Sequence, residues 1–427
     1  MPLYSIGLRC KDAPTWSRLG SAPGHLTTRR DRCALASGAV VGRSFLVLVV
    51  AFSVALGCAS GSALASRQLL LGVFDDANTL NFPAPTFSLL KTLGVQVVRI
   101  SLVWGGRGGV ANSQPQVPTD PADPAYDWSR YDRAIEDAQN AGIEVLLTIV
   151  GTPQWANGGQ GPERAPSSVT DLYDFAYAAA TRYSGTFADP KSGLTLPRVQ
   201  MWLAWNEPNN PVFLAPQFTR VNGKWRMAAA VAYAKICNAV FDAVHATTGP
   251  EQVACGATAP RGNNDPTSSR PSISPIAFLR AAKAAGLRTF DAWAHHPYYG
   301  DPNQTPATRP PTNGAIELGN IGNLIAEVLQ LYGQKPLWIT EYGYQTNPPN
   351  TLYGVSWSKQ AAYLRQAYLS AQANPHISLF TWFLLRDNPS VGGWQSGLIT
   401  AAGRKKPSFA TFEHLRSARA PTVVPAR

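Results

Sequence analysis

The sequence predicts an α/β protein whose eight parallel strands close into a single (β/α)8 barrel, known as a TIM barrel. Short apolar runs alternate with longer helical patterns along the chain after residue 68, which is typical of right-handed βαβ units. Tight turns that contain glycine precede the strands, whereas long segments rich in Pro, Gly, Asn and Trp follow them. Long loops on the carboxyl side of the strands are how such a barrel builds a binding site.

Eight segments have the composition of buried strands. Each is short and almost continuously apolar, as expected of a parallel strand that is covered on both faces. In chain order the predicted strands are Leu69–Phe74, Val95–Ser101, Ile143–Val150, Val199–Trp205, Val253–Ala257, Phe290–Ala294, Leu337–Glu341 and Ser378–Phe383.

Helical patterns separate most of these strands, and a last one closes the series. An open doubly wound sheet would alternate in the same way. The segment after the first strand has no glycine-rich phosphate-binding pattern, however, which favours the closed barrel. The predicted helices are Trp128–Ala141, Thr170–Tyr183, Met227–Thr247, Ile276–Ala285, Ala315–Leu331, Lys359–Ala373 and Ser408–Arg416. Glycines at expected helix ends, where a positive φ is needed, are Gly94, Gly142, Gly286 and Gly333.

Residues 1–65 have the pattern of a secretory signal segment. Basic residues precede an apolar run, Phe45–Gly57, that is too short to span a bilayer as a helix. Ala63-Leu64-Ala65 fits a cleavage site, which would make Ser66 the new N-terminus. The sequence therefore predicts a secreted, extracellular protein without a membrane span, with one catalytic barrel over residues 66–418 and a tail over 419–427. A loose lipobox ending at Cys58 leaves lipid anchoring at the cell surface as the alternative.

Charge and cysteine content narrow the function classes. The formal net charge is +11, of which residues 1–65 carry seven Lys/Arg and two Asp/Glu, so the remainder holds +11 − 5 = +6. This balance, without a basic run on a helix, does not predict a nucleic-acid partner. Cys237 and Cys255 are the cysteines that remain after cleavage, either as a disulfide or as two buried thiols. No Cys/His spacing indicates zinc, and no metal or cofactor is expected. The oligomeric state is not predicted.

Two glutamates end predicted strands that would otherwise be apolar. Glu207 closes the fourth strand and Glu341 the seventh, so both carboxylates belong at the catalytic rim of the barrel. Cleavage of a glycosidic bond needs such a pair, one group as the acid and the other as nucleophile or base. Retaining enzymes hold the two carboxyl groups about 5–5.5 Å apart and inverting enzymes about 6.5–9.5 Å. Arg99, an arginine inside an apolar strand, needs a buried partner and is the candidate to pair with Glu341.

These residues resemble the clan A retaining glycoside hydrolases, and among them families 39 and 5. The matching elements, in order, are Arg99, Trp205-Asn206-Glu207-Pro208, His295-His296-Pro297-Tyr298, Thr340-Glu341 and Trp382. The segment Gly151–Ala156 favours family 39, although the chain lacks the additional β-sandwich of many family 39 xylosidases.

The resemblance implies a role for each matching residue. Glu207 would be the acid/base, and Glu341 the nucleophile that forms a covalent glycosyl-enzyme. Asn206 would bond the sugar 2-hydroxyl, which requires the strand to end or bulge so that it and Glu207 both reach the site. Arg99 and Tyr298 would hydrogen-bond Glu341.

Further residues would shape the sugar site. His296 would lie beside the sugar or pack as an ordinary loop histidine. Trp382, Trp155 and Trp104 are candidate stacking platforms, with Trp394 as a further one. The expected substrate is an oligo- or polysaccharide, with a β-linkage as the default. A non-catalytic carbohydrate-binding barrel, an inverting hydrolase and a transglycosylase that uses the same residues are the alternatives.

Overall fold

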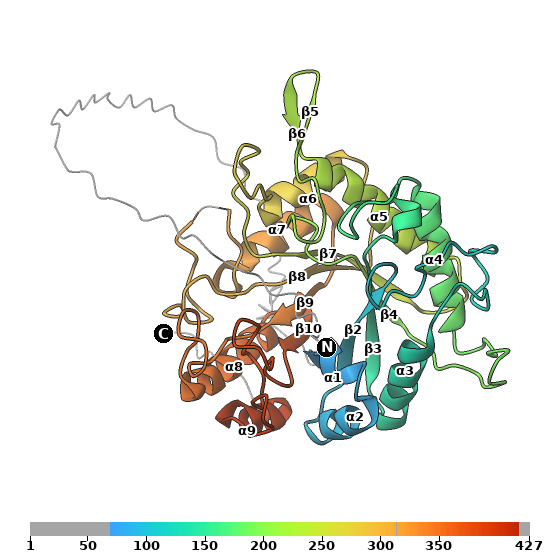
Figure 1. The fold of residues 1–427 in the computed structure, drawn as a ribbon. Helices are drawn as coiled ribbons and strands as arrows, with labels where there is room; N and C mark the ends of the chain where they lie inside the picture. The colour runs from blue at the N-terminus through green and yellow to red at the C-terminus, as the bar shows by residue number, and fades with distance from the viewer. Residues whose placement is uncertain (1–68, 313, 418–427) are drawn as a thin grey trace, which may run out of the picture. The chain divides into compact units, whose positions relative to one another are not determined.

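The computed structural model describes residues 69–312 and 314–417 (Figure 1). The leader and the tail predicted from the sequence lie outside these ranges. Eight parallel strands form a closed barrel in the order β1-β10-β9-β8-β7-β4-β3-β2, so the predicted fold class is confirmed. Among the described residues, no helix is long and apolar enough to cross a membrane. The barrel strands are β1 (Leu70–Phe74), β2 (Val97–Val103), β3 (Glu144–Val150), β4 (Met201–Ala204), β7 (Gln252–Thr258), β8 (Ala292–His295), β9 (Leu337–Tyr342) and β10 (Ile377–Phe383).

Pairing between the first and last strands closes the barrel. β1 runs parallel to β10, with Leu70 opposite Leu379 and Phe74 opposite Phe383. Each predicted strand overlaps one of these eight, with ends that differ by up to two residues. The largest contraction is in the fourth strand, where the ladder stops at Ala204 rather than at Trp205. The carboxyl ends of the strands therefore surround one common rim.

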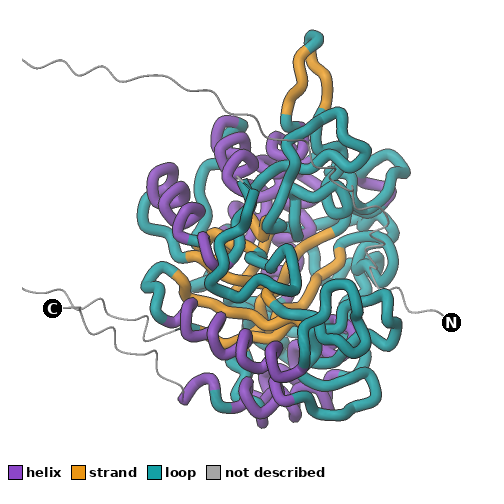
Figure 2. Tube along the Cα trace, turned by 90° about the vertical axis from the view of Figure 1, so that its left-hand side faces the viewer, coloured by secondary structure: helices purple, strands orange, loops and turns teal. Residues whose placement is uncertain are grey.

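Helices cover the outside of the barrel, and Figure 2 shows the strands in the centre with helices around them. Four glycines predicted at helix ends have positive φ angles of 70 to 95°. The helices are α1 (Asp76–Thr79), α2 (Pro83–Thr92), α3 (Ser129–Ala141), α4 (Val169–Arg182), α5 (Ala228–His245), α6 (Pro275–Ala284), α7 (Gly322–Tyr332), α8 (Trp357–Gln372) and α9 (Pro407–Glu413).

Two helical segments differ from the prediction. The helices predicted from the sequence begin at Trp128, whereas the structure has α1 and α2 between the first two strands, with Pro83 and Pro85 in α2. Both lie in the first turn of α2, whose N–H groups have no acceptor within the helix, so the prolines cost little. The helix predicted from Ala315 begins only at Gly322, because residues 318–320 form a separate 3-10 turn with its own capping interactions.

Alternate residues of the strands point into the barrel or out toward the helices. The inner cluster includes Val97, Leu146 and Leu379, with small alanines beside the large ring of Trp338. Residues next to these in the sequence, such as Val98 and Phe380, belong to the outer core between strands and helices. This two-residue alternation decides which side chains reach the catalytic rim.

The cysteine alternative is decided by the structure, which pairs Cys237 on α5 with Cys255 on β7 in a disulfide. Both residues are fully buried, so the bond links a helix of the outer layer to the barrel. The long loop after β4 contains an unpredicted two-stranded hairpin, β5 (Thr219–Val221) and β6 (Lys224–Arg226).

Candidate active site

Glu207 reaches the rim because the chain breaks out of the strand just before it. Trp205 and Glu207 have positive φ angles of 69° and 38°, which side chains other than glycine rarely adopt. The Glu207 N–H donates to the Ala257 carbonyl at 2.9 Å and holds this backbone in place. Asn206 and Glu207 therefore face the same centre, which a regular strand would not allow.

Arg99 connects the groups at the centre of the rim. Its side chain is fully buried on β2 and points into the barrel. It donates to Glu341 Oε1 at 2.7 Å and to Asn206 Oδ1 at 2.6 Å. It also donates to Thr148 Oγ1 at 2.9 Å and to the Thr340 carbonyl at 3.2 Å. These bonds satisfy the buried guanidinium and fix the Glu341 carboxylate in position.

Tyr298 supplies the second hydrogen bond to Glu341. Its hydroxyl donates to Glu341 Oε2 at 3.0 Å, so the two carboxylate oxygens have different donors. Burial, followed by the negative charge of Glu341, holds the pKa of Tyr298 well above its ordinary value. The hydroxyl therefore keeps its proton and remains a donor.

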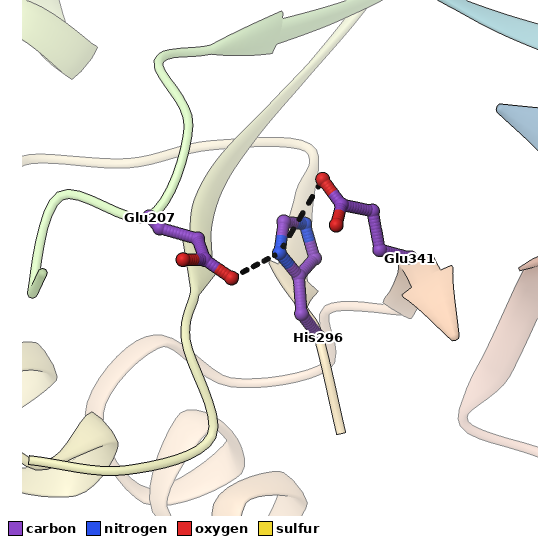
Figure 3. Close-up of side chains that lie close together, drawn as sticks. All are labelled: Glu207, His296 and Glu341. Carbon is purple, nitrogen blue, oxygen red and sulfur yellow. Dashed lines mark hydrogen bonds and ion pairs between the residues drawn. The ribbon is translucent and has the colours of Figure 1, made fainter. Parts of the chain in front are cut away.

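His296 lies between the two carboxylates, as Figure 3 shows. Its Nδ1 is 3.1 Å from Glu207 Oε1 and 3.7 Å from Glu341 Oε1. Burial lowers the pKa of His296 to about 3, so the ring is neutral at physiological pH. Nε2 lies 3.0 Å from Thr340 Oγ1 and 3.3 Å from Arg99, which can only donate, and this environment favours the tautomer with its proton on Nδ1. The imidazole thus directs one N–H toward the carboxyl pair.

Glu207 holds its proton near neutral pH. Burial raises the pKa of Glu207 to about 7, against a hydrogen bond from Asn210 and the positive charges of Arg99 and Arg270. The Asn210 side-chain amide donates to Glu207 Oε2 at 2.9 Å. A carboxyl group with a pKa near 7 is suited to donate a proton and later to accept one.

The two carboxyl groups are close together. One oxygen of Glu207, one oxygen of Glu341 and a nitrogen of His296 all lie within 4.8 Å of one another. This close approach of two carboxylate oxygens is compatible with the short separation of the carboxyl groups in retaining glycosidases. The same three groups have the donor atoms of a cation site. However, Glu341 is already paired with Arg99 at 2.7 Å, and this fixed positive charge disfavours a metal ion there.

The stacking role predicted for Trp382 and Trp104 is wrong, because neither ring has any exposed surface. Trp382 belongs to the outer core with Phe380, whereas Leu379 faces the barrel interior. Residues an odd number of positions from Leu379 therefore face the helices, and Trp382 is three positions away. Trp104 is buried in an aromatic cluster, 5.6 Å between ring centres from Phe175.

Other aromatic residues are the candidates for stacking on the sugar. Phe383 has the inward orientation that Trp382 lacks, and it is only partly buried. Trp394, also partly buried, lies 5.4 Å from Phe383 and 5.1 Å from Tyr298 between ring centres. Trp394 is therefore a platform candidate beside Glu341. Trp155 remains partly buried, with its indole N–H bonded to the Ala111 carbonyl.

Sequence reasoning missed Phe383, Asn210 and Thr148 as parts of the site. Counting residues in steps of two from the inward-facing positions of the strands would have found Phe383 and Thr148. No sequence signal indicates Asn210, because its contact with Glu207 depends on the turn after β4.

Comparison with known proteins gives similarity of structure only. No family model and no curated protein matches the sequence. Among solved structures, a family 39 glycoside hydrolase from Bacteroides cellulosilyticus superposes with a TM-score of 0.56 at 19% identity, over 83% of this chain and 64% of that one. A glucosidase from Croceicoccus marinus gives 0.58 at 14% identity, over 83% and 67%. A fungal β-1,4-galactanase gives 0.53 at 14% identity, over 81% and 99%.

This chain shares their fold. The fold expected from the resemblance to clan A glycoside hydrolases is therefore confirmed, and a family 39 glycoside hydrolase, a glucosidase and a β-1,4-galactanase have it. The chain spans less than two thirds of the length of the family 39 enzyme. The chemistry of this chain has to be argued from its own site.

Proposed function

We propose that this protein is a retaining glycoside hydrolase that cleaves O-glycosidic bonds by double displacement. The observation that carries the proposal is the carboxyl pair. Glu207 and Glu341 approach within 4.8 Å, and they have different environments. Burial raises the pKa of Glu207 to about 7, whereas Glu341 is paired with the buried Arg99. Two carboxyl groups with separate protonation states are what an acid and a nucleophile require.

In the first step, Glu341 attacks the anomeric carbon while the bond to the leaving oxygen breaks. Glu207 gives its proton to that oxygen, so the departing group leaves as a neutral alcohol. In the second step, Glu207 removes a proton from water, and the oxygen of that water replaces the Glu341 ester oxygen at the same carbon. Asn206 is held by Arg99 at 2.6 Å, which leaves its amide nitrogen to donate to the sugar 2-hydroxyl.

A β-linked glycan is the proposed substrate class, in line with the β-1,4-galactanases among the structural neighbours. A non-catalytic carbohydrate-binding barrel is the weaker reading, because a binding protein has no use for a protonated carboxyl group beside an ion-paired one. A transglycosylase would use the same first step and replace water with a second sugar.

The test is hydrolysis of aryl xyloside, glucoside, galactoside, mannoside and arabinofuranoside by the wild type and by variants. Glu341→Gln should abolish the activity. Glu207→Gln should impair it less, because an aryl leaving group hardly needs an acid. Glu144→Gln is the matched control, since this exposed residue begins β3 at the opposite end of the barrel.

Proton NMR of the first-formed sugar should show the anomer of the substrate. The inverted anomer would contradict the double displacement, and activity that survives Glu341→Gln would place the chemistry elsewhere. Absence of hydrolysis of the aryl glycosides and of polymeric substrates would favour the carbohydrate-binding barrel. Products longer than the substrate would show transglycosylation.

We also propose that the protein is exported and cleaved after Ala65. The buried Cys237–Cys255 disulfide supports an oxidising compartment. Mass spectrometry of the exported chain should give a mass that begins at Ser66. Incorporation of labelled palmitate, lost in Cys58→Ser, would instead show lipid anchoring at Cys58.

A further inference from the structure

After Glu207, the loop between β4 and α5 carries basic residues without acidic ones. Residues 208–227 contain Arg220, Lys224 and Arg226 and no Asp or Glu. All three lie on the hairpin β5–β6, which projects from the barrel at the top of Figure 1 and of Figure 2. The hairpin turns at Asn222-Gly223, where both residues have positive φ angles. Every residue of both strands is exposed.

A tryptophan is exposed among these cations. Trp225 is 43% exposed, and the guanidinium of Arg220, its partner on the other strand, lies 5.3 Å from its ring centre. Among the described residues, none forms an ion pair with Arg220, Lys224 or Arg226. An isolated two-stranded hairpin adds little stability of its own. Arg220 and Trp225 account for each other as a cross-strand pair, but Lys224 and Arg226 have no ion-pair partner among the described residues.

The base of the hairpin is attached directly behind the proposed acid/base. Gln217, which is almost fully buried, donates from Nε2 to the Pro208 carbonyl at 2.9 Å. The following loop, residues 259–274, is attached to the next residue, because the Ile273 N–H donates to the Asn209 carbonyl at 3.0 Å. Both loops thus begin at the leaving-group side of the site.

Arg270 in that second loop adds a fourth cation. It is exposed, it has no ion-pair partner among the described residues, and its positive charge acts on the Glu207 carboxyl. Asp265 in the same loop is exposed and bonded to Thr267. The loop that follows the Glu341 strand differs, because residues 343–356 contain no charged side chain. Between these loops, the unpaired positive charge is therefore on the Glu207 side.

We propose that the β5–β6 hairpin and Arg270 form a basic surface that binds a carboxylated polysaccharide, with its anionic sugars on the leaving-group side. This surface comprises both faces of the hairpin, because Arg220 and Trp225 lie on one face and Lys224 and Arg226 on the other. The indole offers a flat face to a sugar ring, and guanidinium and ammonium groups are the usual partners of carboxylates. The direction of the chain rests on the proposed function, because the acid protonates the leaving group. Binding itself does not depend on it.

The first experiment is native gel electrophoresis of the full chain in gels that contain polygalacturonate or neutral dextran. Polygalacturonate should retard the wild type, and dextran should not. The triple variant Arg220→Gln/Lys224→Gln/Arg226→Gln should bind about tenfold more weakly, since exposed ion pairs each contribute modestly. Arg270→Gln should weaken binding by a smaller factor.

The matched control is Lys91→Gln/Arg133→Gln/Lys359→Gln, which removes the same charge from exposed positions on α2, α3 and α8. This control should keep both the retardation and the hydrolysis of the aryl glycoside. Equal weakening by the two triple variants would refute the proposal, because it would show a net-charge effect. Equal retardation by dextran, or tighter binding of duplex DNA than of polygalacturonate, would also refute it.

The variant Glu341→Gln separates this inference from the proposed function. It should lose hydrolysis and bind polygalacturonate like the wild type. If polygalacturonate retards the wild type but the wild type hydrolyses no glycoside, the proposed binding surface is supported and the proposed hydrolase function is refuted. Hydrolysis by a protein that polygalacturonate does not retard would support the hydrolase and refute the basic surface.

Discussion

Loss of the Asn210 side chain should extend the activity to higher pH. The Asn210 amide donates to Glu207 Oε2 at 2.9 Å, and a donor bonded to a carboxylate favours its charged form. In Asn210→Ala the charged form loses this bond, so the pKa of Glu207 should rise above its value of about 7. The acid then keeps its proton at a pH where the wild type has lost it.

The size of the rise follows from the burial of the group. The Glu207 side chain is only 12% exposed, so water screens the bond weakly. A hydrogen bond to a charged group contributes about 1.5–3 kcal/mol, and one pKa unit corresponds to 1.36 kcal/mol. The expected rise is therefore about one to two units.

The assay is kcat/KM from pH 4 to 10 on a glycoside with a poor leaving group, because this parameter reports the pKa of the free enzyme. The basic limb should move from about pH 7 to about pH 8 or above. Asn81→Ala is the matched control, since this exposed asparagine bonds only the Ala77 carbonyl in α1. A basic limb that stays in place, or moves to lower pH, would refute the assignment of Glu207 as the acid.

Three further results are expected. Arg99→Met should lower kcat/KM by more than about 100-fold and destabilise the fold by about 3–5 kcal/mol, because it leaves Glu341 buried without its partner at 2.7 Å; near-normal kinetics would contradict this. Cys237→Ala/Cys255→Ala should lose about 3 kcal/mol in urea unfolding, as expected for a disulfide with a sequence separation of 18, and an unchanged midpoint would show that the bond is absent. Burial lowers the pKa of His295 to about 3, so below pH 6.5 the unfolded chain takes up a proton that the folded chain does not. Thermal stability should therefore fall as pH drops from 6.5 toward 3, and it should fall less in His295→Asn. An equal loss of stability in the wild type and the variant would contradict this prediction.

The sequence predicted the barrel well because its signals are local and repeated. Apolar runs, glycine turns and long loops recur along the chain, and Glu207 and Glu341 are recognisable as charges at the ends of apolar strands. Their meeting within 4.8 Å follows from closure of the barrel, which brings strand ends together at one rim. The fold class and the central carboxyl pair could therefore be read without coordinates.

The surrounding residues were harder to predict, because the direction of a side chain depends on small shifts of register. Trp382 and Phe383 are neighbours in the sequence, and only the pleat of β10 decides that Phe383 points inward. Asn210 depends on a backbone with positive φ at Glu207, which no propensity indicates. The β5–β6 hairpin carried a signal in Asn222-Gly223, but its exposure is visible only in three dimensions.

The bonds of Arg99 have a consequence for the timing of proton transfer. When Glu341 becomes an ester in the proposed double displacement, its negative charge disappears while the guanidinium remains charged and fully buried. The charge balance of the centre then shifts by one unit toward positive, and the positive charge of Arg99 already lowers the pKa of Glu207. The pKa of Glu207 should therefore be lower in the intermediate than in the free enzyme. One fixed cation would make the same carboxyl group an acid before the ester forms and a base afterwards, without movement of either residue.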